Sequence, residues 1–115
     1  MLQKYISQLT SNTRLTTAYS LDRVRRLAEH FWNPQESYKT IHIAGTNGKW
    51  SVSQMTFAIL KEAWCKVGIF TSPYLLDITE SIQTNDGYIP HERFTKYFEE
   101  ILKIAPQTTF FEAKT

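Results

Sequence analysis

The chain has 115 residues and a formal net charge of +2, which limits it to one domain of modest size. An apolar fraction of 42% excludes an intrinsically disordered chain, and the nearly balanced charge gives no indication of a nucleic-acid partner. No stretch approaches the roughly 18 apolar residues of a membrane span, so we expect no membrane partner either.

A single cysteine, Cys65, excludes an intramolecular disulfide and a cysteine-rich metal site. The start of the chain also lacks an apolar block of signal-peptide length. Both observations favour a reducing, cytoplasmic setting.

Apolar residues at helical spacing predict two helices before residue 35. The first is expected over residues 2–9 and to end at Ser11-Asn12-Thr13. The second is expected over residues 21–31, with Ser20 as its N-cap, and to end near Asn33-Pro34, because the residue before proline is disfavoured in a helix.

Between residues 40 and 70 the pattern alternates between strand and helix. Residues 40–44 and 66–70 are short and apolar, which predicts two buried strands, and residues 51–63 between them carry helical spacing. A strand, turn, helix and strand in this order predict a right-handed parallel crossover. The expected fold class is therefore α/β, with a parallel sheet flanked by helices.

The last third of the chain contains a loop, a hairpin and a helix by the same criteria. Residues 74–80 are expected to form the loop, and Asn85-Asp86-Gly87 between β-prone stretches predicts the hairpin. The helix is expected over residues 94–102 and to end before Pro106.

The turn after the first predicted strand carries the most informative residues, which are Gly45, Thr46, Asn47, Gly48, Lys49 and, two positions on, Ser51. Glycines let backbone N–H groups approach an anion, and a helix N-terminus adds partial positive charge. Lysine supplies a full charge for phosphates, and a hydroxyl at the helix start can reach a phosphate or its Mg²⁺.

The strict P-loop pattern is not satisfied, because its first glycine would fall at Ile43 and its hydroxyl residue at Trp50. Two interpretations remain open, a phosphate-binding site and a tight turn with a solvent-exposed lysine. A strand before the turn and a helix after it favour the phosphate site.

Several motifs occur in one order along the chain: Ser20-Leu21-Asp22-Arg23-Val24, Asn33-Pro34-Gln35, His42-Ile43-Ala44-Gly45-Thr46-Asn47-Gly48-Lys49, Lys66 to Leu75, Thr79-Glu80, Ile89-Pro90, Phe94 and Thr109-Phe110-Phe111-Glu112. In these motifs the chain resembles the N-terminal part of the dihydrofolate synthase/folylpolyglutamate synthase family, within the Mur ligase superfamily. The resemblance implies a P-loop-type parallel sheet flanked by helices, as in the N-terminal part of a Mur-ligase-like ATPase domain. Residues 1–115 are then a partial ATP-binding domain, without its remainder and without the glutamate-binding domain.

The resemblance also implies an ATP-dependent ligase that adds L-glutamate to folate or dihydropteroate. ATP phosphorylates the carboxylate, and the amine of glutamate attacks the acyl phosphate to form an amide. The phosphate turn would hold the triphosphate, with Lys49 as the catalytic residue, and Ser72 would bind Mg²⁺. The alternative for Ser72-Pro73 is an ordinary turn.

Four further positions align with the family's pteridine-side pocket, namely Leu21, Asp22, Thr109 and Phe111. For Thr109 and Phe111, packing in the core is the competing explanation. Residues 74–83 would be a mobile loop over the site, and Glu112 is expected to be structural rather than a metal ligand.

We expect no ligase activity from these 115 residues alone, and a monomer at full length. The alternative is a free-standing nucleotide-binding or interaction module that kept the phosphate turn and lost the catalysis.

The composition holds one anomaly, since only 4 glycines occur beside 3 tryptophans. At an average of about 7%, roughly eight glycines are expected. Trp32, Trp50 and Trp64 all stand where the resembled family has glycine. This coincidence indicates a UGA codon, which some bacteria translate as glycine and others as tryptophan.

Overall fold

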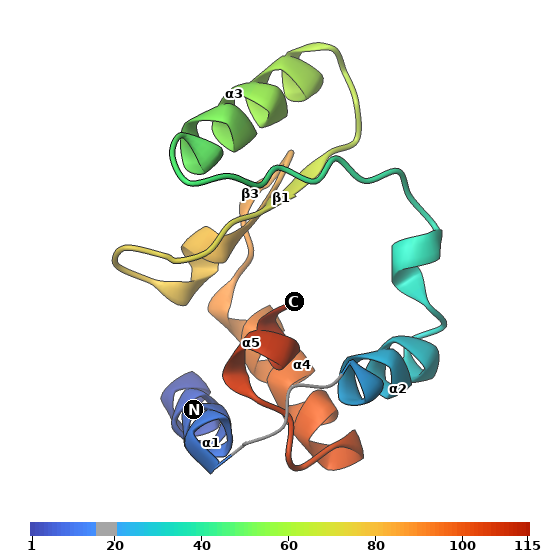
Figure 1. Cartoon of the computed structure of the whole chain (residues 1–115), viewed down its shortest axis with the longest axis vertical. Helices are drawn as coiled ribbons and strands as arrows, with labels where there is room; N and C mark the ends of the chain where they lie inside the picture. Colours follow the sequence, from blue (N-terminus) through green and yellow to red (C-terminus); the bar gives the residue numbers. More distant parts are fainter. Residues whose placement is uncertain (16–20) are drawn as a thin grey trace. The chain divides into compact units, whose positions relative to one another are not determined.

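The computed structural model describes residues 1–15 and 21–115, which form two compact units (Figure 1). Unit 1 comprises Met1–Lys39 and His91–Thr115, and unit 2 comprises Thr40–Pro90. Among the described residues, each helix is too short or too polar to cross a membrane.

Unit 1 is helical and contains most of the hydrophobic core. Its elements are α1 (Leu2–Leu15), α2 (Asp22–His30), the 3-10 helix η1 (Pro34–Glu36), α4 (His91–Ile104) and α5 (Phe110–Lys114). The buried apolar side chains recur at helical spacing, as expected: Leu9, Leu27, Phe94, Phe98, Ile101, Leu102 and Ala113. The rings of Phe94 and Phe98 lie 5.3 Å apart, so successive turns of α4 face one core.

Helix α1 is longer than the sequence predicts, because it continues through the Ser11-Asn12-Thr13 segment. The side-chain amide of Asn12 donates to the carbonyls of Pro106 and Thr108, each at 2.8 Å. The Thr13 hydroxyl accepts from the Phe110 N–H at 3.0 Å. Contacts with residues more than 90 positions away therefore stabilise a stretch that would otherwise favour a turn.

Helix α2 agrees with its prediction at the C-terminal end. It runs from Asp22 to His30, with Leu21 in the N-cap position. Ser20, the predicted N-cap, lies outside the described residues.

Unit 2 consists of one long helix and a small sheet. Its elements are α3 (Lys49–Glu62), β1 (Gly68–Phe70), the 3-10 helix η2 (Ile78–Ser81), β2 (Ile82–Thr84) and β3 (Gly87–Tyr88). The strands pair antiparallel in the order β1-β2-β3, with Ile69 opposite Gln83 and Thr84 opposite Gly87.

The hairpin between β2 and β3 forms where the sequence predicts it. Gly87 has a φ of 110°, which an L side chain rarely adopts. The Asn85 side chain accepts from the Val67 N–H at 2.8 Å and donates to the Cys65 carbonyl at 2.9 Å. The turn is thereby fastened to the start of the neighbouring strand.

The first predicted strand, residues 40–44, does not form, and the parallel crossover is not present among the described residues. Ile41 is 64% exposed and Ile43 is half-buried. A strand of a parallel sheet needs a hydrogen-bonded neighbour and a helix over each face. The sheet of unit 2 pairs β1 with β2 instead, so residues 40–44 have no ladder.

Most apolar side chains of helix α3 are exposed, because the sheet beside the helix is small. Val52, Met55 and Ile59 are all exposed, whereas Phe57 is buried. The three short strands cover only part of the helix, so most of the predicted apolar stripe is open.

Candidate functional site

The N-terminus of α3 begins at a turn with two glycines of positive φ. Gly48 occupies the N-cap with a φ of 77°, and Gly45 has a φ of 153°, so both glycines adopt backbone that disfavours a side chain. The first α-helical hydrogen bond runs from the Val52 N–H to the Gly48 carbonyl at 2.9 Å. The N–H groups of Lys49, Trp50 and Ser51 therefore lie at the open end of the helix, where the helix dipole is positive and no acidic residue lies in the first turn.

A concavity of about 340 Å³ opens at this helix end. Its lining comes from the loop before α3, from the first turns of α3 and from the segment at the end of β1: Ile43, Thr46, Asn47, Gly48, Lys49, Trp50, Ser53, Phe70, Thr71, Ser72 and Pro73.

The concavity brings together most of the residues predicted to bind phosphate and metal. Thr46, Asn47, Gly48, Lys49 and Ser72 line it, although Ser72 is more than 20 positions from the loop. Gly45 and Ser51 adjoin these residues in the chain but do not line the concavity.

The Lys49 ammonium currently has a partner within the loop. Its Nζ donates to the carbonyl of Gly45 and so folds back over the turn. Lys49 is exposed and its side chain is flexible. The ammonium group therefore lies against the turn that precedes α3.

Phe70, Thr71 and Pro73 also line the concavity, although they were not predicted as neighbours of the loop. A usable signal was present, because Phe70 ends a predicted strand and Thr71 and Pro73 come just after it. In open α/β sheets ligands bind beyond the carboxyl ends of strands. The residues after β1 could therefore have been assigned to the same site as the residues before α3.

The loop after Ser72 is organised around the carboxylate of Glu80. Glu80 accepts hydrogen bonds from the N–H groups of Leu75 (2.9 Å), Leu76 (3.0 Å) and Asp77 (2.9 Å). These bonds lower the pKa of Glu80 below its ordinary value, and the bond from Leu75 has the largest effect. Asp77 and Glu80 also form a capping box at the start of η2, which the D-x-x-E spacing could have predicted.

In unit 1, an ion pair joins α2 to α5. Arg23 donates from Nη2 to Glu112 at 2.9 Å and from Nε to both carboxylate oxygens at 3.1 Å. Burial raises the pKa of Glu112, but hydrogen bonds from Arg23 and Thr109 outweigh burial and lower it overall. The bond to Glu112 raises the pKa of Arg23. This geometry gives Glu112 a structural role.

The four positions predicted to face the pteridine flank this ion pair. Leu21 and Asp22 directly precede Arg23, and both are exposed. The Thr109 hydroxyl donates to Glu112 at 2.8 Å and is buried, so this threonine caps α5 and packs in the core. Phe111 is 57% exposed, so packing in the core does not explain it.

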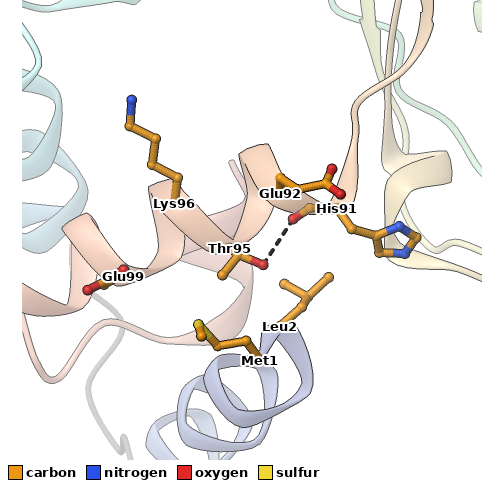
Figure 2. A pocket seen from close by; sticks show the side chains of 7 residues that line it. All are labelled: Met1, Leu2, His91, Glu92, Thr95, Lys96 and Glu99. Carbon is orange, nitrogen blue, oxygen red and sulfur yellow. Dashed lines mark hydrogen bonds between the residues drawn. The ribbon is translucent and has the colours of Figure 1, made fainter.

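A second concavity, of about 500 Å³, lies in unit 1 where the start of α1 meets α4 (Figure 2). Seven residues line it: Met1, Leu2, His91, Glu92, Thr95, Lys96 and Glu99. The Thr95 hydroxyl donates to the His91 carbonyl at 3.0 Å, within one turn of α4, and Lys96 points away from Met1 and Leu2 in Figure 2. None of the predicted site residues lines this depression between two helices.

Metal-binding clusters are missing from the part of the chain that the structure describes, where no three His, Cys, Asp or Glu side chains come together.

Comparison with known proteins finds relatives of this chain, although no family model matches it. Dihydrofolate synthetase of Saccharomyces cerevisiae is 45% identical over 74 residues, which are 64% of this chain and 17% of that protein. Folylpolyglutamate synthase of Thermotoga maritima is 33% identical and superposes with a TM-score of 0.79 over 97% of this chain and 29% of its own.

A third relative is the folylpolyglutamate synthase of Mycobacterium tuberculosis, solved in complexes with ADP and AMPPCP. It is 30% identical and superposes with a TM-score of 0.76 over 95% of this chain and 27% of its own. The chain thus spans less than a third of the length of each relative. These matches confirm the Mur-ligase-like fold, whereas the strands of the described residues pair antiparallel and do not show the predicted parallel sheet. By sequence and by fold, this chain belongs to the dihydrofolate synthase/folylpolyglutamate synthase family and matches a partial stretch of its members.

Proposed function

We propose that this chain supplies the phosphate-binding part of the ATP site in a ligase that joins L-glutamate to folate or dihydropteroate. The observation that carries the proposal is the concavity at the N-terminus of α3, where Gly48, Lys49 and Ser72 come together. The nucleotide complexes of the Mycobacterium tuberculosis relative and the names of the other relatives support it.

In this proposal the loop binds the triphosphate and Lys49 offsets its charge. The N–H groups at the start of α3 and those of Asn47 and Gly48 donate to phosphate oxygens, and the Ser51 hydroxyl adds a further donor. Lys49 leaves the Gly45 carbonyl and pairs with the transferring phosphoryl group. Fixed donors and charge of this kind stabilise a phosphoryl-transfer transition state more than they stabilise the ground state.

The reaction has two balanced steps. The substrate carboxylate attacks the γ-phosphorus of ATP, so that ADP leaves and an acyl phosphate forms. The amine of glutamate then attacks the acyl carbon, phosphate leaves with the bonding electrons, and the amine loses a proton as the amide forms. The loop and Lys49 act in the first step.

Magnesium fits the site in part. Mg²⁺ prefers oxygen ligands and keeps several waters, with substrate phosphates as further ligands. Ser72 lines the concavity together with Lys49, which supports a role for its hydroxyl as a ligand of the ion that accompanies the triphosphate. Bound there, the ion would neutralise phosphate charge.

The proposal assigns residues 1–115 to a partial ATP-binding domain of a cytoplasmic enzyme that is monomeric at full length. Leu21, Asp22, Thr109 and Phe111 form the folate side, with Thr109 acting through the helix that it caps. This stretch alone has no turnover, because binding of glutamate is assigned to a domain outside it.

The experiment compares two proteins, the product of the complete reading frame and the 115-residue chain. Each is given ATP, L-glutamate and either dihydropteroate or tetrahydrofolate, and ADP release and glutamylated product are measured. We expect the complete product to form ADP from ATP only when both co-substrates are present. We expect the short chain to bind ADP but to form none from ATP. Binding without turnover in both proteins would overturn the ligase and favour a nucleotide-binding module.

A further inference from the structure

Two tryptophans have backbone conformations that suit glycine. Trp32 has a φ of 63° and Trp64 a φ of 60°. In this left-handed region the Cβ of an L-residue approaches the following carbonyl oxygen, and only glycine avoids the cost. Of the chain's four glycines, Gly45, Gly48 and Gly87 also have positive φ, so glycine serves this purpose elsewhere in the molecule.

Trp64 occupies the glycine position of a complete helix-ending motif. After α3, the Trp64 N–H donates to the Lys61 carbonyl at 3.1 Å and the Cys65 N–H donates to the Leu60 carbonyl at 3.0 Å. This pair of bonds defines a Schellman motif, and the residue that makes the inner bond is usually glycine.

The end of α2 repeats the motif with Trp32. The Trp32 N–H donates to the Glu29 carbonyl at 3.1 Å, and the Asn33 N–H donates to the Ala28 carbonyl at 2.7 Å. Both tryptophans therefore stand at the same position of the same motif, at the ends of two different helices.

The side chains of Trp32 and Trp64 contribute almost no packing, and that of Trp50 is mostly exposed. Trp32 is 90% exposed, Trp64 is 96% exposed and Trp50 is 61% exposed. Tryptophan normally buries much of its large apolar surface. At position 50 the indole lines the concavity beside Lys49, where it takes up space at the helix end that the proposed phosphates would approach.

We propose that residues 32, 50 and 64 are glycines in the protein as its source organism makes it, because UGA codons at these positions are translated as glycine. Two of the positions then carry the residue that their backbone requires, and the third opens the helix N-terminus to a ligand. The inference goes beyond the proposed function, and it can hold whether or not the protein is a ligase.

Peptide masses and codons test it together. Trypsin cleaves after lysine and arginine, so the three positions fall in separate peptides of residues 27–39, 50–61 and 62–66. The protein is purified from cells of the source organism and digested, and the three peptides are sequenced by mass spectrometry. The peptide of residues 97–103, which has no tryptophan, is the internal control.

We expect UGA codons at all three positions, glycine in all three peptides and the printed sequence in the control peptide. A UGG codon at any of the three positions would overturn the proposal. So would UGA codons with tryptophan in the peptides, since this would show translation by a code that reads UGA as tryptophan.

Discussion

Replacing Trp64 by glycine is expected to stabilise the chain although the change removes a large aromatic side chain. Left-handed backbone costs an L-residue about 1–2 kcal/mol, and glycine avoids this cost. Glycine in turn loses more conformational entropy on folding, which offsets about 0.5–1 kcal/mol of the gain. The indole is 96% exposed, so its removal forfeits very little buried apolar area. The free energy of unfolding should therefore rise by about 1 kcal/mol for Trp64→Gly.

The assay is urea unfolding followed by far-UV circular dichroism, because tryptophan fluorescence changes with the substitution itself. Ala58→Gly is the matched control, since Ala58 is an exposed residue within α3 and its replacement should cost about 1 kcal/mol. Trp32→Gly should resemble Trp64→Gly. If Trp64→Gly lowered stability as the control does, the assignment of a glycine position would be refuted.

Four further predictions follow from individual contacts. Glu112→Ala should cost about 2 kcal/mol in urea unfolding, because it leaves the Arg23 guanidinium without its carboxylate, and an unchanged midpoint would contradict this. The hydrogen bonds of the loop, that from Leu75 first, lower the pKa of Glu80 below 4.5. The stability that these bonds contribute is therefore present above pH 4.5 and is lost as the pH falls through the lowered pKa. The N–H chemical shifts of the loop residues that donate to Glu80 should follow this titration, and a midpoint at or above pH 4.5 would be inconsistent with it. Ser81→Ala should raise stability by up to about 1 kcal/mol, because the buried Ser81 hydroxyl has no hydrogen-bond partner among the described residues; a loss of stability would count against this. Trp50→Gly should tighten ADP binding in titration calorimetry, whereas an unchanged affinity would mean that the indole does not obstruct the site.

The sequence was sufficient to predict elements that depend only on neighbouring residues. The apolar residues of α4 recur at helical spacing because one face of the helix is buried, and Asp86-Gly87 specifies its turn through backbone conformation. The capping boxes at Asp77 and Thr109 were equally readable, since each has glutamate three positions on.

Elements that depend on distant partners could not be predicted in the same way. The end of α1 depends on hydrogen bonds from Asn12 to carbonyls near residue 107, which no window around Asn12 contains. Residues 40–44 have the composition of a strand, but a strand forms only beside another, and β1 pairs with β2.

The candidate site was only partly readable for a related reason. The phosphate loop is contiguous, so its glycines and Lys49 could be recognised directly. Ser72 was assigned through the family resemblance, and its place in the same concavity depends on how the chain folds back from α3 through β1. Spacing alone does not show this fold-back, although the position of Ser72 just after a predicted strand was a signal for the same site.

The most direct test of the account is ADP binding at the N-terminus of α3. Titration calorimetry would compare the unaltered chain with Lys49→Ala and with Lys61→Ala, which removes an exposed lysine from the last turn of the same helix. Loss of a charge-assisted hydrogen bond of about 1.5–3 kcal/mol corresponds to roughly tenfold to a hundredfold weaker binding for Lys49→Ala. We expect this loss together with unchanged binding by Lys61→Ala; equal affinities for ADP in all three proteins would show that Lys49 does not bind the nucleotide.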